Sequence, residues 1–226
     1  MTYNDLLTEI SDVKKISVAM KNSPVINTKL EMFGLYTEDI VRLIKKYKEI
    51  DLNSFELDKY YEINYIYIAI GLIQNKNIEK QYEFLLKNFS HIDSWAITDS
   101  TFKYLEFKKF EEQLVYVKKL IESKEEFLMR YGYLILFKYI KEENLKIIFN
   151  LLKNDEKYYV FMVEAWLIQA IFIHFPEETY DFLAKSNLSK KIKLKAISKI
   201  CDSYRVSKEY KDRVKELRIA IKNQYK

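Results

Sequence analysis

Apolar residues recur every three or four positions along most of the chain, and short polar joints separate the runs. This spacing is the period of an amphipathic α-helix, whereas a half-buried strand would alternate at every second residue. The pattern therefore predicts helices over residues 3–22, 38–48, 55–74, 78–89, 94–104, 107–122, 127–140, 144–152, 158–174, 177–185, 189–204 and 207–223.

Residues that favour helix ends support several of these boundaries. Pro24 is expected to stop the first helix, because proline cannot donate the next backbone hydrogen bond. Asn77 and Asp93 each precede a predicted helix as N-cap residues. Ser123 and Glu126 have the spacing of a capping box and predict the cleanest helix start in the chain.

About twelve helices with short links are compatible with a globular bundle or with a solenoid of stacked helix pairs. The pairs recur roughly every 35–45 residues, the range of HEAT and armadillo repeats. Only three glycines and two prolines occur in 226 residues, too few for the turns of an all-β fold. We expect one all-α domain over residues 1–226, a curved α-solenoid (α–α superhelix) of degenerate HEAT/armadillo-like antiparallel helix pairs.

The scarcity of turn formers and metal ligands also limits the possible chemistry. Gly34, Gly71 and Gly132 stand too far apart for a glycine-rich phosphate-binding loop. Cys201 is the only cysteine and there are two histidines, so neither a disulfide framework nor a Cys/His zinc site is expected. We expect no cofactor and no metal.

The most apolar segment, residues 158–175, is long enough to suggest a membrane span. Glu164 and Gln169 interrupt it, and a carboxylate near the centre of a lone span is costly. A buried helix fits better, and the polar N-terminus lacks the pattern of a secretory signal. We therefore expect a cytoplasmic protein with no membrane partner.

Charge is distributed unevenly. Residues 185–226 hold fourteen Lys and Arg against four acidic residues, a net of +10 beside −5 for residues 1–184. Such asymmetry favours a polyanionic partner such as nucleic acid, although lysines can also simply solvate terminal helices. Lys191, Lys195 and Lys199 recur every four residues and would form one stripe for phosphate contact.

The chain has only two tryptophans. Trp95 stands four residues before Asp99, so a helix would place both side chains on one face. Trp166 lies in the apolar segment. A purely structural interpretation makes both indoles core residues and Asp99 a surface carboxylate.

Several segments resemble the DNA alkylation repair family with HEAT-like repeats, the AlkD-type DNA glycosylases. The sequence HIDSWAITDS at residues 91–100 resembles the family's IDxWxxxD stretch. FLMRYGYLIL at residues 127–136 resembles its arginine helix, and VEAWLI at residues 163–168 resembles its second tryptophan helix. Residues 195–209 resemble its terminal helix pair.

The resemblance implies an α-solenoid whose concave face binds duplex DNA carrying alkylated bases. We expect the protein to be a monomer. It also implies hydrolysis of the N-glycosidic bond of cationic alkylpurines such as 3-methyladenine and 7-methylguanine. On matching positions, Asp99 would be the catalytic carboxylate, Trp95 and Trp166 would form an aromatic cleft, and Arg130 would bind a phosphate beside the lesion.

These residue types suit that chemistry. A cationic alkylpurine is already an activated leaving group, and a carboxylate stabilises the oxocarbenium-like sugar that forms as it departs. Two other hypotheses stay open beside this DNA repair enzyme. One is a non-catalytic helical-repeat scaffold that binds DNA or a protein on its concave face, and the other is RNA binding through the basic end.

Overall fold

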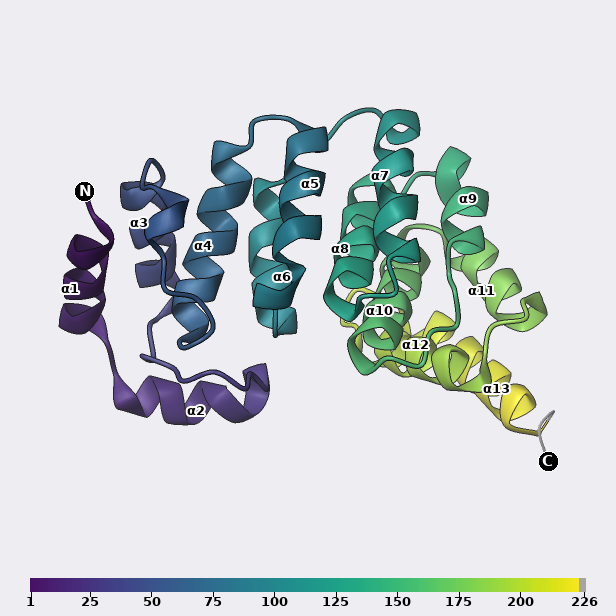
Figure 1. Cartoon of the computed structure of the whole chain (residues 1–226). Helices are drawn as coiled ribbons and strands as arrows, with labels where there is room; N and C mark the ends of the chain where they lie inside the picture. The colour runs from purple at the N-terminus through teal and green to yellow at the C-terminus, as the bar shows by residue number, and fades with distance from the viewer. Residues whose placement is uncertain (224–226) are drawn as a thin grey trace. The chain divides into compact units, whose positions relative to one another are not determined.

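The structure is a computed structural model that describes residues 1–223. This part of the chain is all-α (Figure 1). Its only extended pairing is an isolated bridge between Glu31 and Tyr60. The predicted all-α class is confirmed. The α-helices are α1 Tyr3–Val13, α2 Ile16–Ile26, α3 Thr37–Tyr47, α4 Tyr61–Gln74, α5 Ile78–Asn88, α6 Trp95–Thr101, α7 Phe110–Glu122, α8 Glu126–Leu136, α9 Leu145–Asn150, α10 Tyr158–His174, α11 Pro176–Lys185, α12 Lys190–Asp202 and α13 Lys208–Asn223.

The chain divides within α7 into two compact units, residues 1–116 and residues from 117 onward. In the first unit, α4 packs against α3, α5 and α6, and α1 packs against α3. All residues of α4 from Tyr61 to Leu72 are buried. The core of the first unit is therefore built around α4.

In the second unit, α10 occupies the corresponding place. It packs against α8, α11 and α12, and α13 covers α12 and α11. The observed bounds of α10 equal the predicted range 158–174. Its apolar side chains are buried along most of its length, and none of the helices among residues 1–223 is long and apolar enough to cross a membrane.

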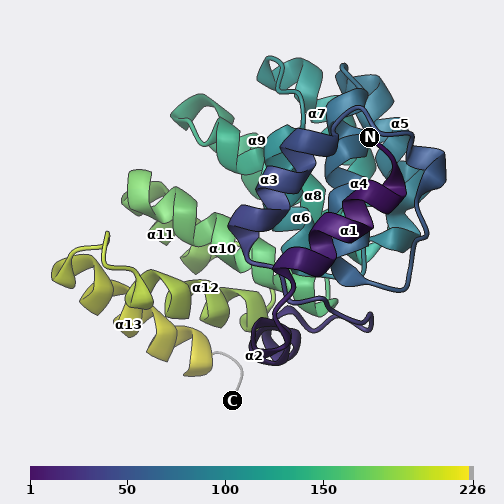
Figure 2. The same cartoon turned by 90° about the vertical axis from the view of Figure 1, so that its left-hand side faces the viewer.

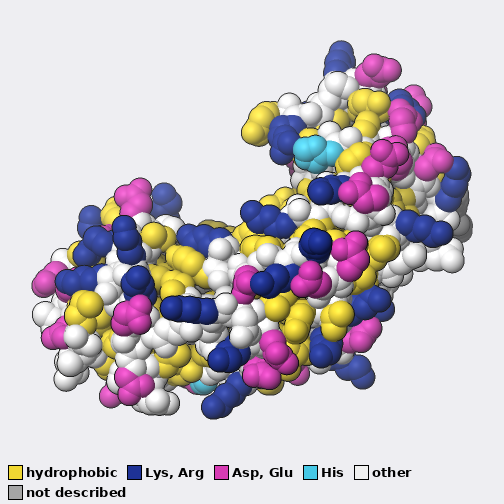
Figure 3. Space-filling view, turned by 90° about the horizontal axis from the view of Figure 1, so that it is seen from above, with side chains coloured by type: hydrophobic (Ala, Val, Ile, Leu, Met, Phe, Trp, Pro, Cys, Tyr) yellow, Lys and Arg dark blue, Asp and Glu magenta, His cyan; other side chains and the backbone are white. Residues whose placement is uncertain are grey.

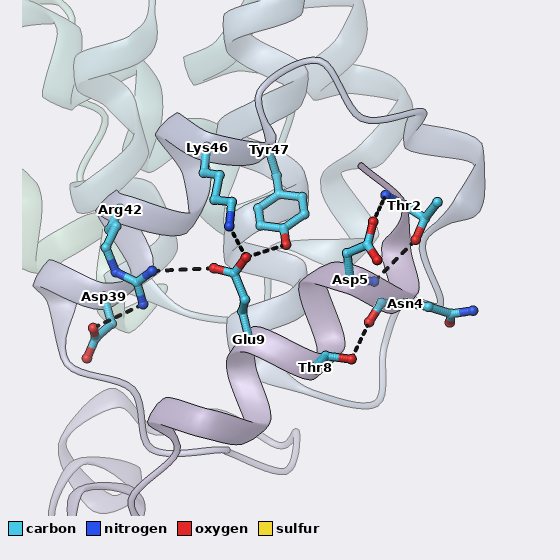
Figure 4. A network of polar contacts seen from close by, with 9 residues as sticks. All are labelled: Thr2, Asn4, Asp5, Thr8, Glu9, Asp39, Arg42, Lys46 and Tyr47. Atoms are coloured by element: carbon cyan, nitrogen blue, oxygen red, sulfur yellow. Dashed lines mark hydrogen bonds and ion pairs between the residues drawn. The ribbon is translucent and has the colours of Figure 1, made fainter.

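The first helix attaches to α3 through a polar network (Figure 4). The carboxylate of Glu9 accepts hydrogen bonds from Lys46 and, at 2.8 Å, from the Tyr47 hydroxyl. The bond from Lys46 contributes most to lowering the pKa of Glu9, while burial and the neighbouring Glu9 raise the pKa of Tyr47 to about 12. Thr2 and Asp5 form a capping box at the start of α1.

The second helix runs crosswise to the other helices of the first unit (Figures 1 and 2). Its start is held by the Lys15 N–H, which lies 3.2 Å from the carbonyl oxygens of both Phe33 and Gly34. Gly34 has φ +80°, and a Cβ there would stand 2.1 Å from the Lys15 carbonyl and 2.6 Å from the Ala19 nitrogen. Only glycine fits this approach of loop and helix.

The predicted helix over residues 3–22 is wrong, because the structure has two helices in that region. The chain turns at Lys14, whose ψ of 144° is extended, and the Lys15 N–H bonds to the loop at residues 33–34 instead of continuing the first helix. Pro24 does not stop a helix. It lies inside α2, which ends at Ile26 and is followed by the C-cap Asn27 in the left-handed conformation.

Three other boundary predictions are wrong. The helix expected over 55–74 begins only at Tyr61, after a turn in which Asp58 has φ +66°. The N-cap of α6 is Ser94, not Asp93. The capping box of Ser123 and Glu126 does not form, because the Ser123 hydroxyl donates to Leu120 and the Glu126 carboxylate accepts the Tyr159 N–H at 2.8 Å.

Candidate functional site

The short helix α6 presents Trp95 and Asp99 one turn apart in the first unit. Ser94 caps the helix by accepting a hydrogen bond from the Ala96 N–H, at 3.1 Å. Trp95 and Asp99 are half-buried, and the Thr98 hydroxyl lies 3.1 Å from Asp99 Oδ1. The structure thus brings together the indole and the carboxylate that the sequence pairs.

The end of α2 and the residues after it hold the start of α6. The Trp95 indole Nε1–H donates to the Val25 carbonyl at 3.1 Å, and the Ser94 hydroxyl donates to the Ile26 carbonyl at 3.2 Å. Asp93 accepts from the Thr28 hydroxyl and from the Lys29 N–H, at 3.1 Å. The indole of Trp95 is therefore oriented by a hydrogen bond as well as by packing, because its one polar atom has a fixed partner.

Trp166 projects from α10 in the second unit, with 37% of its surface exposed. Its ring lies against Phe137, with 4.6 Å between ring centroids. The indole also lines an open groove of about 520 Å³, which Gln169 and Lys199 line as well. Trp166 is therefore only partly a core residue, because one side of the ring faces the groove.

Arg130 is buried in α8 and only 6% exposed. Its Nη1 donates to the Tyr159 carbonyl in the first turn of α10, at 2.8 Å. The guanidinium therefore has a structural contact that the sequence did not indicate. Its charge also reaches Lys199, where it is one of the causes that lower the pKa.

The lysines of α12 separate into two groups. Lys193 is buried and donates to the Ser186 carbonyl at 2.6 Å, and Lys190 donates to the Lys222 carbonyl at 3.4 Å. The other group is the predicted stripe of Lys191, Lys195 and Lys199, in which Lys191 is exposed and the other two are half-buried. Within the stripe, Lys191 Nζ lies over the Phe161 ring of α10, 4.5 Å from its centroid.

Lys199 lies where burial and neighbouring cations both disfavour its positive charge. Burial lowers its pKa most, repulsion from Lys195 and Arg130 lowers it further, and Asp202 opposes the shift. An anion bound at this point would relieve the repulsion among three cations. The predicted basic residues Arg130, Lys195 and Lys199 are thus electrostatically coupled in the second unit.

Charge alone does not mark a single patch. Figure 3 shows Lys and Arg side chains interspersed with Asp and Glu on the face that it draws. The basic end predicted from residues 185–226 includes residues 224–226, which lie outside the described residues. Within residues 1–223, no group of three or more His, Cys, Asp or Glu side chains could hold a metal ion.

Sequence reasoning missed two features of the second unit. Glu164 is fully buried, and its Oε1 accepts hydrogen bonds from the Tyr133 hydroxyl and the Lys153 N–H, each at 2.7 Å. Tyr204 is 93% exposed and lines the same groove as Trp166. The interruption of an apolar helix by Glu164 was visible in the sequence, whereas nothing there indicated the exposure of Tyr204.

One known family matches this chain. The model of the family described as DNA alkylation repair enzyme matches residues 6–200, and no curated protein matches the chain. The match covers most of both units and includes α6, α8 and α10, the helices that carry Asp99, Arg130 and the two tryptophans. The chain therefore belongs to the DNA alkylation repair enzyme family.

Proposed function

We propose that this protein is a DNA glycosylase that hydrolyses the N-glycosidic bond of cationic alkylated purines in duplex DNA. The observation that carries the proposal is the pairing of Trp95 and Asp99 on one turn of α6, in a chain of the DNA alkylation repair family. Family membership supports DNA as the substrate. The carboxylate and the indole of α6 support hydrolysis of the N-glycosidic bond as the reaction.

Asp99 is the proposed catalytic carboxylate. Alkylation at a ring nitrogen leaves the purine positively charged, so it departs without a general acid. Bond breaking then transfers positive charge to the deoxyribose, where a nearby carboxylate stabilises it and orients the attacking water. Half-burial suits this role, because partial exclusion of water strengthens the interaction between the carboxylate and the developing cation.

Each tryptophan is a proposed aromatic contact for the bound DNA within its own unit. Flat indoles attract cationic rings through cation–π interactions, each worth about 0.5–2 kcal/mol. Trp95 is held in place by its hydrogen bond to Val25, and Trp166 is presented by α10 with part of its ring exposed. An indole that is already oriented loses little conformational entropy on binding.

The basic residues of the second unit are the proposed phosphate contacts. Lys191, Lys195 and Lys199 lie on one stripe of α12, and Arg130 adds positive charge beside Lys199. Because such contacts release counterions from DNA, the affinity should fall steeply as salt increases.

The decisive experiment measures base release from duplex DNA that contains 7-methylguanine, under single-turnover conditions. Asp99→Asn keeps the shape of the side chain and removes only its charge. We expect its excision rate to fall at least about 100-fold, equivalent to about 2.7 kcal/mol of barrier, with the affinity for DNA retained. Asp12→Asn is the matched control, because Asp12 is an exposed carboxylate on α1 and should leave excision unchanged.

Two results would contradict the proposal. An Asp99→Asn rate within about twofold of the parent rate, less than 0.5 kcal/mol of barrier, would remove Asp99 from the reaction. Failure of the parent protein to release any base above the spontaneous rate, while still binding the duplex, would instead favour the non-catalytic scaffold.

A further inference from the structure

The turn between α12 and α13 places a large aromatic side chain in solvent. Tyr204 is 93% exposed, the highest value among the exposed large hydrophobic residues of the described chain. Single exposed apolar side chains are common on folded surfaces, so the exposure of Tyr204 is informative only because of the groups beside it. It stands at the edge of the groove that Trp166 lines.

The exposure of Tyr204 does not come from a loosely held loop. Ser203 accepts the Arg205 N–H on its hydroxyl at 3.3 Å, and the Val206 N–H donates to the Ser203 carbonyl at 3.4 Å. Val206 is buried directly after the turn. Tyr204 therefore stands in a short turn whose backbone hydrogen bonds lead back to Ser203.

The rest of the groove combines apolar and charged groups. Phe137 and Ile173 line it together with Trp166, and Lys199 and Arg205 contribute two cations. Asp202 is the one acidic residue in its lining. The volume of about 520 Å³ lies within the range of roughly 300–1,000 Å³ that is typical of small-ligand sites.

This composition selects among possible occupants. An apolar protein surface would cover Lys199 and Arg205 without supplying partners, and burial of unpaired charge is costly. A nucleotide satisfies both kinds of lining, because its phosphate pairs with cations and its base or sugar packs against aromatic rings.

We propose that the groove holds one nucleotide of the bound DNA duplex, with Tyr204 and Trp166 against its base or sugar and Lys199 and Arg205 at its phosphate. The inference rests on the proposed function for the identity of the DNA, and it adds Tyr204 and Arg205 to the binding surface. The lowered pKa of Lys199 agrees with it, since burial and neighbouring cations leave that side chain in need of an anion.

The first test uses the full-length protein and an unmodified duplex. Tyr204→Ala should raise the Kd about fivefold, because the loss of one aromatic contact is worth on the order of 1 kcal/mol. Tyr204→Phe should bind like the parent, because it keeps the ring. Tyr158→Ala is the matched control, since Tyr158 is 57% exposed in the same unit and does not line the groove.

Salt dependence separates the two kinds of contact. Arg205→Gln and Lys199→Gln should each reduce the slope of log affinity against log salt by about 0.9, because each variant loses one phosphate contact. Tyr204→Ala should weaken binding without changing the slope. In a Trp95→Phe background Trp166 is the only indole, and its fluorescence should change on addition of DNA.

The outcomes distinguish this inference from the proposed function. Binding by Tyr204→Ala and Arg205→Gln within about twofold of the parent, with base release intact, would overturn the groove as a nucleotide site and leave the glycosylase standing. A parent protein that binds DNA with the expected losses in these variants, yet releases no base, would support the groove and contradict the enzyme. Absence of any affinity for the duplex would overturn the inference.

Discussion

The central helices of the two units, α4 and α10, each contain a glutamate that is fully buried. Glu62 stands in the first turn of α4, where both carboxylate oxygens accept backbone hydrogen bonds. They bond to the N–H groups of Phe33 and Gly34 at 3.0 and 2.8 Å, and of Leu35 at 3.3 Å. The N-terminal end of the helix also favours a negative charge there.

Glu164 lies in the second turn of α10, farther from the helix start, and uses its carboxylate differently. The hydrogen bonds from Tyr133 and Lys153 both go to Oε1. Oε2 is buried and accepts no such hydrogen bond from the described residues. Burial is the main cause that raises the pKa of Glu164. The comparison shows that two equally buried carboxylates can be held differently, because three backbone N–H groups share both oxygens of Glu62, whereas two donors converge on one oxygen of Glu164.

Replacement of Glu62 should have the largest effect. In Glu62→Gln the amide NH₂ must face at least one backbone N–H of the loop, so a buried donor loses its acceptor. We expect the free energy of unfolding of the first unit to fall by about 2–4 kcal/mol, measured by urea denaturation. A loss below about 1 kcal/mol would mean that the loop finds other acceptors and that the two glutamates are equivalent.

Replacement of Glu164 should cost less and should change the response to pH. In Glu164→Gln the amide oxygen can still accept from Tyr133 and Lys153, so we expect a loss of about 1 kcal/mol near neutral pH. The parent binds a proton at Glu164 more tightly when folded, because its pKa is raised. The contribution of Glu164 to stability therefore decreases as pH rises through the interval between the unfolded and the folded pKa.

Glutamine does not titrate, so the variant lacks this decrease. The stability of Glu164→Gln relative to the parent should improve as pH increases from about 4 toward neutrality, measured by denaturation at several pH values. Parallel curves for the two proteins would show that burial does not shift the titration of Glu164.

The two tryptophans, one in each unit, allow a further comparison, in which the expected losses of stability are the smallest. Trp95→Phe removes the hydrogen bond to the Val25 carbonyl and should cost about 1 kcal/mol of stability. Trp166→Phe removes no hydrogen bond among those described and leaves a site that is already 37% exposed, so it should cost less than about 0.5 kcal/mol. Thermal melting measures both, and equal losses would show that the bond from Trp95 contributes nothing.

The sequence was informative where local pattern decides the outcome. The apolar run of α10 predicted its bounds, and the four-residue spacing predicted that Trp95 and Asp99 share a face. It failed at positions where a distant segment decides. The break near Lys15 depends on the carbonyls of residues 33–34. Asp93 was predicted as a helix cap, but its carboxylate accepts hydrogen bonds from Thr28 and Lys29 instead.

The same limitation applies to the candidate site. The sequence indicated that Arg130 is a cation on a helix, but its burial against Tyr159 depends on how α8 packs on α10. The roles of Asp99, Trp95, Trp166 and the lysine stripe stay predictions of the resemblance and of their chemistry. Tyr204 is a candidate DNA contact because it is exposed beside Trp166, a property of the fold that no local sequence pattern indicates.

Gly34 places an evolutionary constraint on residues outside the candidate site. Any side chain at this position would displace the first turn of α2, because a Cβ has no room beside Lys15 and Ala19. The far end of that helix supplies the carbonyl that orients the Trp95 indole. A lineage can therefore replace Gly34 only together with changes in α2, so the loop and the helix are inherited as one unit even though neither carries the proposed chemistry.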